Sequence, residues 1–261
     1  MASTEPVVYF HGIPGGPGEL EAFGHSALWL VSQGYLPDRQ EMSPGASLSS
    51  HFDRLASDIN SRFETSQVRF VGFSLGAYVA LEVASRMGSK VSHISLVSAA
   101  APLATGHFLP DMAGKVVFQS ARRAPFVLEA LIALQSLVLR VAPDKLFDAL
   151  FGDAKGLDRD LAEQPLFRAA IIETLRKCFQ VGSSNYRREL MGYVGDWSSI
   201  LPLIRQPVEL WHGSLDNWAP PAMADALAAR LPNVTSLHWL EGSSHYSALQ
   251  TFLEQNPRQA W

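Results

Sequence analysis

One stretch of the sequence constrains the fold more than any other, because it joins a buried strand to a helix through a sharp turn. Residues 68–73 are mostly β-branched or aromatic, as is typical of a strand buried on both faces. Gly72, Ser74 and Gly76 form a G-x-S-x-G pattern, and a helical pattern follows over residues 77–87. A serine at such a turn takes strained backbone angles, and the two glycines remove side chains that would clash. The pattern predicts that Ser74 projects from the carboxyl edge of a sheet as a nucleophile.

G-x-S-x-G alone also arises by chance in a chain with this Gly and Ser content, so its surroundings matter. Strand patterns recur over residues 7–10, 91–97, 208–211 and 235–240, and helical patterns over 20–32, 48–63 and 221–230. Alternation of strands and helices is typical of a parallel, doubly wound α/β sheet. We therefore predict a mostly parallel α/β fold.

The alternation stops between residues 102 and 190, where only helical patterns occur. We predict that residues 1–101 and 191–261 form the α/β core and that residues 102–190 are inserted as a helical cap. A helical half packed as its own domain is the alternative. Residues 126–141 are apolar around most of the helix circumference, which suits a helix that is covered on both sides.

Composition and charge exclude several classes of protein. With 47% hydrophobic and 18% charged residues, the chain is neither disordered nor fibrous nor a coiled coil. A net charge of −4 gives no electrostatic reason to expect nucleic-acid binding. The single cysteine, Cys178, allows no internal disulfide framework, and no Cys/His cluster suggests a metal or a cofactor.

Membrane spans and secretion signals are not expected either. The longest apolar stretch, residues 126–142, is interrupted by Glu129, Gln135 and Arg140, whereas a span needs about 20 residues with few charges. Residues 1–6 lack the basic and apolar regions of a secretory signal. The expected location is therefore the cytoplasm.

A glycine-rich turn follows the first predicted strand, from His11 and Gly12 to Gly18. Such a turn lets backbone N–H groups approach an oxygen that becomes negative during acyl transfer. Ile13 is the expected donor from this turn, since Pro14 has no N–H, and Leu75 is the expected second donor. A phosphate-binding loop is the alternative, but the turn lacks both glycine patterns of such loops.

The base and its orienting carboxylate come from the last two strand ends. Among eight histidines, His245 lies in a small-residue loop after the last strand, where an imidazole can reach across the sheet edge. Asp216 follows the preceding predicted strand, and the carboxyl ends of neighbouring parallel strands share one edge. Asp196 and Asp225 are rivals, but neither lies at a predicted strand end.

These residues together resemble the α/β-hydrolase fold superfamily. The similarity lies in His11-Gly12, in Gly72-Phe-Ser-Leu-Gly76, and in the loops of Asp216 and His245, in the superfamily's own order of serine, acid and histidine. The resemblance implies a serine hydrolase with a helical cap, a nucleophile elbow at Ser74 and an oxyanion hole.

Two features depart from that family. Members usually have two strands before the His-Gly strand, whereas only residues 1–6 precede that strand in this sequence. Without those two strands, the strand over residues 7–10 would form a bare edge of the sheet. We hypothesise that a homodimer or the N-terminal segment masks this edge. The second departure is Ala77, where many relatives have Gly.

The predicted chemistry is hydrolysis of a small-molecule ester or lactone through an acyl-enzyme, carried out by Ser74, His245 and Asp216. The apolar cap is expected to roof the pocket. Arginine pairs at 122–123 and 187–188 are either anion contacts or a solvated face. The alternatives are a peptidase resembling proline iminopeptidases, a carbon–carbon bond hydrolase, and a hydrolase-fold receptor with little turnover.

Overall fold

A parallel sheet forms the centre of the protein. The computed structural model describes residues 5–39, 46–181 and 183–256. Within these residues, five parallel strands are ordered β1-β2-β3-β4-β5. Their bounds are Val7–Phe10, Val68–Phe73, Val91–Val97, Val208–Gly213 and Val234–Leu240, respectively. The predicted parallel α/β fold is confirmed.

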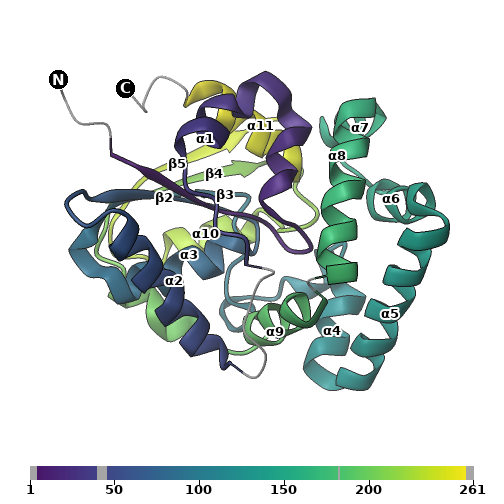
Figure 1. Cartoon of the computed structure of the whole chain (residues 1–261), viewed down its shortest axis with the longest axis horizontal. Helices are drawn as coiled ribbons and strands as arrows, with labels where there is room; N and C mark the ends of the chain where they lie inside the picture. Colours follow the sequence, from purple (N-terminus) through teal and green to yellow (C-terminus); the bar gives the residue numbers. More distant parts are fainter. Residues whose placement is uncertain (1–4, 40–45, 182, 257–261) are drawn as a thin grey trace.

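Helices cover both faces of this sheet, as expected for a doubly wound fold (Figure 1). Helices α1 (Leu28–Gln33) and α11 (His245–Gln255) lie on one face. Helices α2 (Leu48–Arg62), α3 (Gly76–Met87) and α10 (Ala222–Ala228) lie on the other. Because both faces are covered, β1 and β4 are buried along their whole length, which explains their continuous apolar sequences.

The helix predicted over residues 20–32 is wrong in its first part. A 3₁₀ helix, η1 (Pro17–Ala27), comes before α1, and Gly24 interrupts it with a φ of 50°. Leu20, Phe23 and Leu30 are buried in this stretch. Their spacing suits a 3₁₀ helix as well as an α-helix, so periodicity alone could not distinguish these two helix types.

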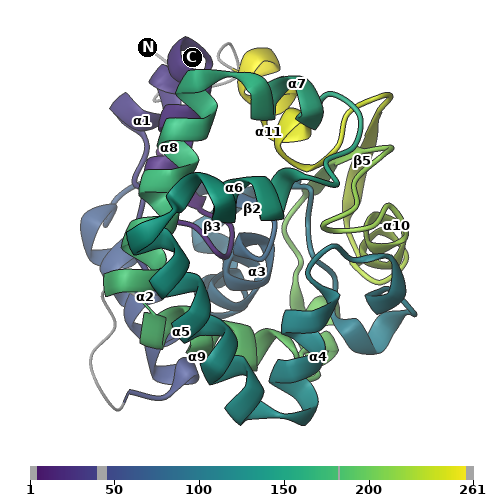
Figure 2. The ribbon, with the colours of Figure 1, turned by 90° about the vertical axis from the view of Figure 1, so that its right-hand side faces the viewer.

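In the described residues between β3 and β4 there are six α-helices, which stand beyond the carboxyl ends of the strands (Figures 1 and 2). They are α4 (Lys115–Arg123), α5 (Pro125–Val141), α6 (Pro143–Phe151), α7 (Asp158–Glu163), α8 (Pro165–Arg176) and α9 (Ser183–Tyr193). Proline begins α5, α6 and α8, where its missing N–H costs nothing. We call residues 102–190 the helical segment.

Helix α5 is covered on one side only, so the expectation of cover on both sides is wrong. Leu128, Ile132 and Leu139 are buried, but Phe126 is 76% exposed and Val141 73% exposed. Its apolar outer face lies at the surface of the helical segment. Despite this composition, no helix within the described ranges is long and apolar enough to cross a membrane.

The outer edge of β1 is partly paired by a segment that the sequence did not indicate. Tyr35 accepts a hydrogen bond from Tyr9 N–H at 2.9 Å and donates its own N–H to Val7 O at 2.8 Å. This parallel bridge follows α1 in the chain. Residues 1–4 lie outside the described residues, and a homodimer across this edge stays a prediction.

Candidate functional site

Ser74 occupies the turn between β2 and α3 with a φ of 56°, in the left-handed region that side chains other than glycine rarely adopt. Its N–H donates to Val97 O at 3.0 Å, which fixes the turn against β3. A Cβ atom on Gly76 would lie 2.1 Å from Phe10 O, and one on Gly72 would lie 2.8 Å from Ala77 Cα. Both glycines are therefore required by close backbone contacts.

Asp216 and His245 form a buried pair at the ends of β4 and β5. His245 Nδ1 lies 2.8 Å from Asp216 Oδ2, and since a carboxylate only accepts, Nδ1 carries the proton. The other oxygen, Oδ1, accepts N–H groups from Trp218 at 2.8 Å and Ala219 at 2.9 Å. Burial alone would raise the pKa of Asp216, but His245 and these donors hold it below its ordinary value.

A second histidine stands close to the same carboxylate. His212 Nε2 lies 2.8 Å from Ala219 O, to which it donates, and 3.7 Å from Asp216 Oδ2. Burial lowers the pKa of His212, so it is neutral and supports the loop of Asp216. The rival carboxylates are elsewhere: Asp196 and Asp225 are both exposed.

Residues next to Ser74 in the chain and in the sheet contact His245, although Ser74 itself makes no hydrogen bond to it in the described residues. The Phe73 ring centroid lies 4.9 Å from that of His245, and Ser98 Oγ donates to His245 O at 3.0 Å. Within the described parts of the chain, no hydrogen bond joins Ser74 Oγ to His245. Catalytic hydrogen bonds are often long in a structure without substrate, so the absence of this hydrogen bond does not exclude His245 as the base.

The glycine-rich turn lies directly against Ser74. A Cβ atom on Gly12 would be 3.4 Å from Ser74 Cβ. Gly12 N–H donates to Glu19 Oε1 at 2.9 Å, which fixes the start of the turn. The N–H groups of Ile13 and Leu75 make no protein hydrogen bond among the residues described. Two backbone donors therefore remain available beside Ser74.

A buried ion pair between Arg39 and Glu189 supports the glycine-rich turn at His11. The sequence analysis did not predict it. Arg39 Nη2 donates to His11 O at 2.8 Å, while Arg39 Nε lies 3.0 Å from Glu189 Oε1 of α9. Burial alone would raise the pKa of Glu189, but Arg39 lowers it to about 2. Burial lowers the pKa of His11 to about 3, so this histidine is neutral. The network ties the turn to the helical segment.

Aromatic side chains of the α/β part surround the imidazole, and a ring of the helical segment packs behind them. Trp218 stacks on His245 with centroids 5.7 Å apart and planes 19° apart. Phe151 of α6 lies 5.7 Å from Trp218 and 5.5 Å from Tyr246. Trp218 follows Asp216 by two residues, and this position in the sequence could have identified it as a neighbour of the site. Phe151 had no such signal.

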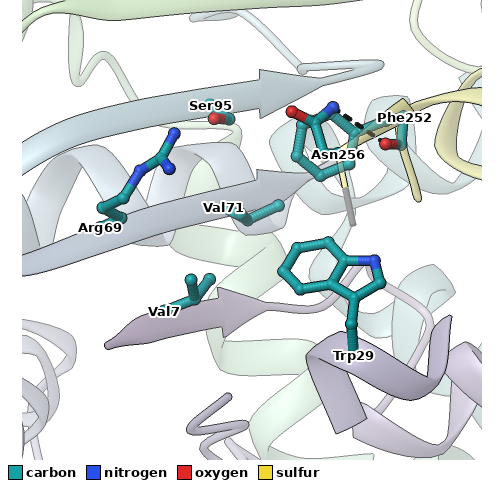
Figure 3. A pocket seen from close by; sticks show the side chains of 7 residues that line it. All are labelled: Val7, Trp29, Arg69, Val71, Ser95, Phe252 and Asn256. Carbon is teal, nitrogen blue, oxygen red and sulfur yellow. Dashed lines mark hydrogen bonds between the residues drawn. The ribbon is translucent and has the colours of Figure 1, made fainter. Parts of the chain in front are cut away.

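Two of the pockets among the described residues lie away from Ser74. The small pocket in Figure 3 lies along the strands under α1 and α11, with Trp29, Val71 and Phe252 in its walls. Ligands of open α/β sheets bind beyond the carboxyl ends of the strands, so this is not the candidate site. A larger cavity of about 670 Å³ reaches Asp216 between the helical segment and the loop after β4, and neither Ser74 nor His245 lines it. The described residues contain no group suited to hold a metal ion.

Comparison with known proteins identifies the family. Residues 7–259 match the sequence model of the alpha/beta hydrolase family. The chain belongs to this family. It is 31% identical over 173 residues to a pimeloyl-[acyl-carrier protein] methyl ester esterase from Aromatoleum aromaticum. That alignment covers 62% of this chain and only 60% of the relative's length.

Solved structures of the family share the fold at low sequence identity. A thermophilic esterase from Thermogutta terrifontis has a TM-score of 0.66 and 19% identity, over 98% of this chain and 86% of the esterase. The enol-lactonase from Burkholderia xenovorans LB400 has a TM-score of 0.62 and 15% identity, over 99% and 92% of the two chains. At such identities the likeness shows the fold alone.

Proposed function

We propose that this protein is a serine hydrolase that cleaves a small-molecule carboxylic ester or lactone. The observation that carries the proposal is the buried 2.8 Å contact between Asp216 and His245 at the strand edge where Ser74 is held with a φ of 56°. Serine, acid and histidine follow in the order of the α/β hydrolases. The methyl ester esterase and the enol-lactonase to which the chain is similar support an ester or lactone bond as the target.

Each residue has a defined task in the proposed reaction. His245 Nε2 takes the proton of Ser74 Oγ, which attacks the carbonyl carbon, while the N–H groups of Ile13 and Leu75 stabilise the oxyanion. The proton then passes to the leaving alcohol. Water, deprotonated by His245, cleaves the acyl-serine. Asp216 fixes the imidazole tautomer throughout and stabilises the imidazolium.

Residues 102–190 are proposed to act as the cap of this site. The walls that they contribute near His245 are aromatic, with Phe151 and Phe167 both beside Tyr246. Apolar walls favour an apolar acyl or alcohol group. A cytoplasmic location and a homodimer belong to the same proposal.

The test is hydrolysis of p-nitrophenyl acetate, butyrate and octanoate by wild type and by Ser74→Ala. Loss of the nucleophile is expected to lower kcat/KM by at least about 10⁴-fold for every ester. The matched control is Ser61→Ala, at an exposed position of α2, which should leave kcat/KM unchanged.

Each other outcome is informative. Equal turnover by wild type and Ser74→Ala would refute the assignment of Ser74. An absence of turnover in both would refute ester hydrolysis. Assays with other compounds would then separate the alternatives. Hydrolysis of proline p-nitroanilide would indicate a peptidase, and cleavage of a vinylogous diketone would indicate a carbon–carbon bond hydrolase. Binding of these compounds without turnover would indicate a receptor.

A further inference from the structure

A buried carboxylate of the helical segment meets the first turn of the helix that carries His245. Asp158, the first residue of α7, is 1% exposed. Its Oδ2 accepts the N–H of Tyr246 at 3.0 Å, and its Oδ1 accepts the N–H of Ser247 at 2.7 Å. The first N–H groups of a helix have no partner within the helix, and a carboxylate satisfies two of them here. This partner lies 88 residues away in the sequence, so it is a tertiary contact rather than a local cap.

The same carboxylate also reaches the residue before His245. Ser247 Oγ donates to Asp158 Oδ1 at 2.5 Å and accepts the N–H of Ser244 at 2.8 Å. Residues on both sides of His245 are therefore tied to one carboxylate, directly on one side and through a hydroxyl on the other. The backbone of His245 is held between them.

The chain just before Asp158 runs along the loop just before His245. Leu157 N–H donates to Gly242 O at 3.0 Å. Gly156 has a φ of +49°, and a Cβ atom there would lie 2.1 Å from Gly242 O. Only glycine fits this approach. The contact thus extends from Gly156 to Asp158, along the loop from Gly242 to Ser247.

We propose that Asp158 is a positioning residue for His245, through which the helical segment sets the place of the imidazole relative to Ser74 and Asp216. The inference rests on the proposed function, because it assigns His245 as the base. Asp158 does not touch the reacting atoms. It acts through the first turn of α11, whose rotation or shift would carry the imidazole with it.

The charged environment agrees with this role. Burial raises the pKa of Asp158, while its Ser247 and Tyr246 donors and the charge of His245 lower it. The ionisable groups around the imidazole are Asp216 in direct contact, His212, Asp158 and the buried Glu19. Loss of the charge at Asp158 therefore removes one of the groups that favour the imidazolium.

The test is Asp158→Asn, in which an NH₂ group replaces one of the two acceptors. Tyr246 N–H and Ser247 N–H are bound by different oxygens of the carboxylate, so an NH₂ group in place of either oxygen faces a backbone donor, and the first turn of α11 must shift. We expect kcat on p-nitrophenyl butyrate to fall by about 10- to 100-fold, as for a displacement on the order of 1 Å, with KM within about twofold. The acidic limb of the kcat/KM profile should move to lower pH. Asp160→Asn is the matched control, because Asp160 is an exposed residue of the same helix.

A merely structural role gives a different result. If Asp158→Asn lowers the Tm but leaves kcat and the pH profile unchanged at a temperature where it is folded, the proposal is wrong. A rise of KM with unchanged kcat would also overturn it, since Asp158 would then act in substrate binding. If the variant does not fold, Ser247→Ala removes the relay alone and should lower kcat severalfold with unchanged KM.

One readout does not depend on ester turnover. The imidazole nitrogen and Nδ1 proton resonances of His245 report whether Nδ1–H stays bonded to Asp216. They should shift or broaden in Asp158→Asn and stay unchanged in Asp160→Asn. If wild type hydrolyses no ester but these resonances change, the proposed function fails while the positioning role stands. Unchanged resonances would overturn the positioning role, whatever the activity.

Discussion

The two carboxylate oxygens of Asp216 have different partners, and this difference determines what an amide would do in their place. Oδ1 accepts two backbone N–H groups, from Trp218 and Ala219, whereas Oδ2 accepts only the Nδ1 proton of His245. In Asp216→Asn, the amide oxygen takes the place of Oδ1, because only an oxygen can accept the N–H groups of Trp218 and Ala219. The NH₂ group must then face His245, which reverses the imidazole tautomer and leaves Nε2 protonated.

We expect Asp216→Asn to keep the fold and lose the base. A protonated Nε2 cannot take the Ser74 proton, so kcat on p-nitrophenyl butyrate should fall by about 10⁴-fold with little change in KM. Steady-state kinetics, with circular dichroism to check the fold, measure this directly. Asp225→Asn is the control, at an exposed carboxylate of α10. A fall of less than tenfold in Asp216→Asn would argue that another carboxylate orients the imidazole.

Sequence reasoning could propose Ser74, Asp216 and His245 because each follows a predicted strand within a few residues, although the structure has His245 as the first residue of α11 rather than in the predicted loop. It could not propose Glu19, Arg39, Glu189 or Asp158. For the last three the partners lie far along the chain: Arg39 and Glu189 are 150 residues apart, and Asp158 and Tyr246 are 88 apart. A buried charge has no local signature, since the same residue type is usually exposed.

At the level of elements, the turn between β2 and α3 depends on a backbone contact that no side chain permits. The Cα of Gly76 faces the carbonyl oxygens of Phe10 and His11, which a Cβ atom would meet at 2.1 and 2.4 Å. Backbone atoms at the end of a hydrogen-bonded strand cannot give way as a flexible side chain would. The first turn of α3 can therefore approach β1 only with glycine at this position.

Gly76→Ala is accordingly expected to destabilise the protein by roughly 4 kcal/mol or more, among the largest effects of a single methyl group. The measurement is urea unfolding followed by tryptophan fluorescence. Gly18→Ala is the matched control, because a Cβ atom there meets nothing closer than 3.5 Å. It should change the free energy of unfolding by less than about 1 kcal/mol. Equal unfolding midpoints for the two variants would contradict the steric account.

The strands were predictable, and within residues 102–190 so were α4, α5, α6 and α8, for which the apolar patterns predict helices over 118–123, 126–141, 144–151 and 166–179. The strands β1, β2 and β3 have the bounds that their apolar runs predict, because burial on both faces leaves a continuous signal. Helices α7 and α9 were missed. The six residues of α7 are too few for a clear period, and α9 buries polar residues, Asn185 and Glu189, on the face that packs inward.

For the whole molecule, the candidate site lies where the helical segment joins the sheet. Glu189 holds Arg39 behind the glycine-rich turn, Asp158 holds the start of α11, and Phe151 packs on Trp218. Each of these three contacts connects the helical segment to a loop that carries a candidate catalytic group. The stability of the whole protein and the geometry of its site therefore depend on the same buried polar groups.

Glu19 shows how such a group makes stability depend on pH. It is 1% exposed, and its Oε1 accepts Tyr9 OH at 2.6 Å and Gly12 N–H at 2.9 Å. Burial raises its pKa from 4.5 to about 7, against the opposing effects of these donors, Arg39 and His245. Between pH 4.5 and 7 the folded protein therefore keeps a proton that the unfolded chain has lost. The resulting stabilisation is complete below pH 4.5 and is lost as the pH rises to about 7.

The expected size is about 3 kcal/mol between these two pH values, from about 1.4 kcal/mol for each unit of pKa. His11, whose pKa is lowered to about 3, contributes a slope of opposite sign, so the test compares proteins that share it. In Glu19→Gln the neutral amide keeps the acceptor for Tyr9 and Gly12 without titrating. Urea unfolding from pH 4.5 to 8 should show the free energy of wild type falling relative to Glu19→Gln as the pH rises, whereas Glu163→Gln, at an exposed position, should run parallel to wild type. A constant difference between wild type and Glu19→Gln across this range would mean that Glu19 is ionised in the folded protein throughout.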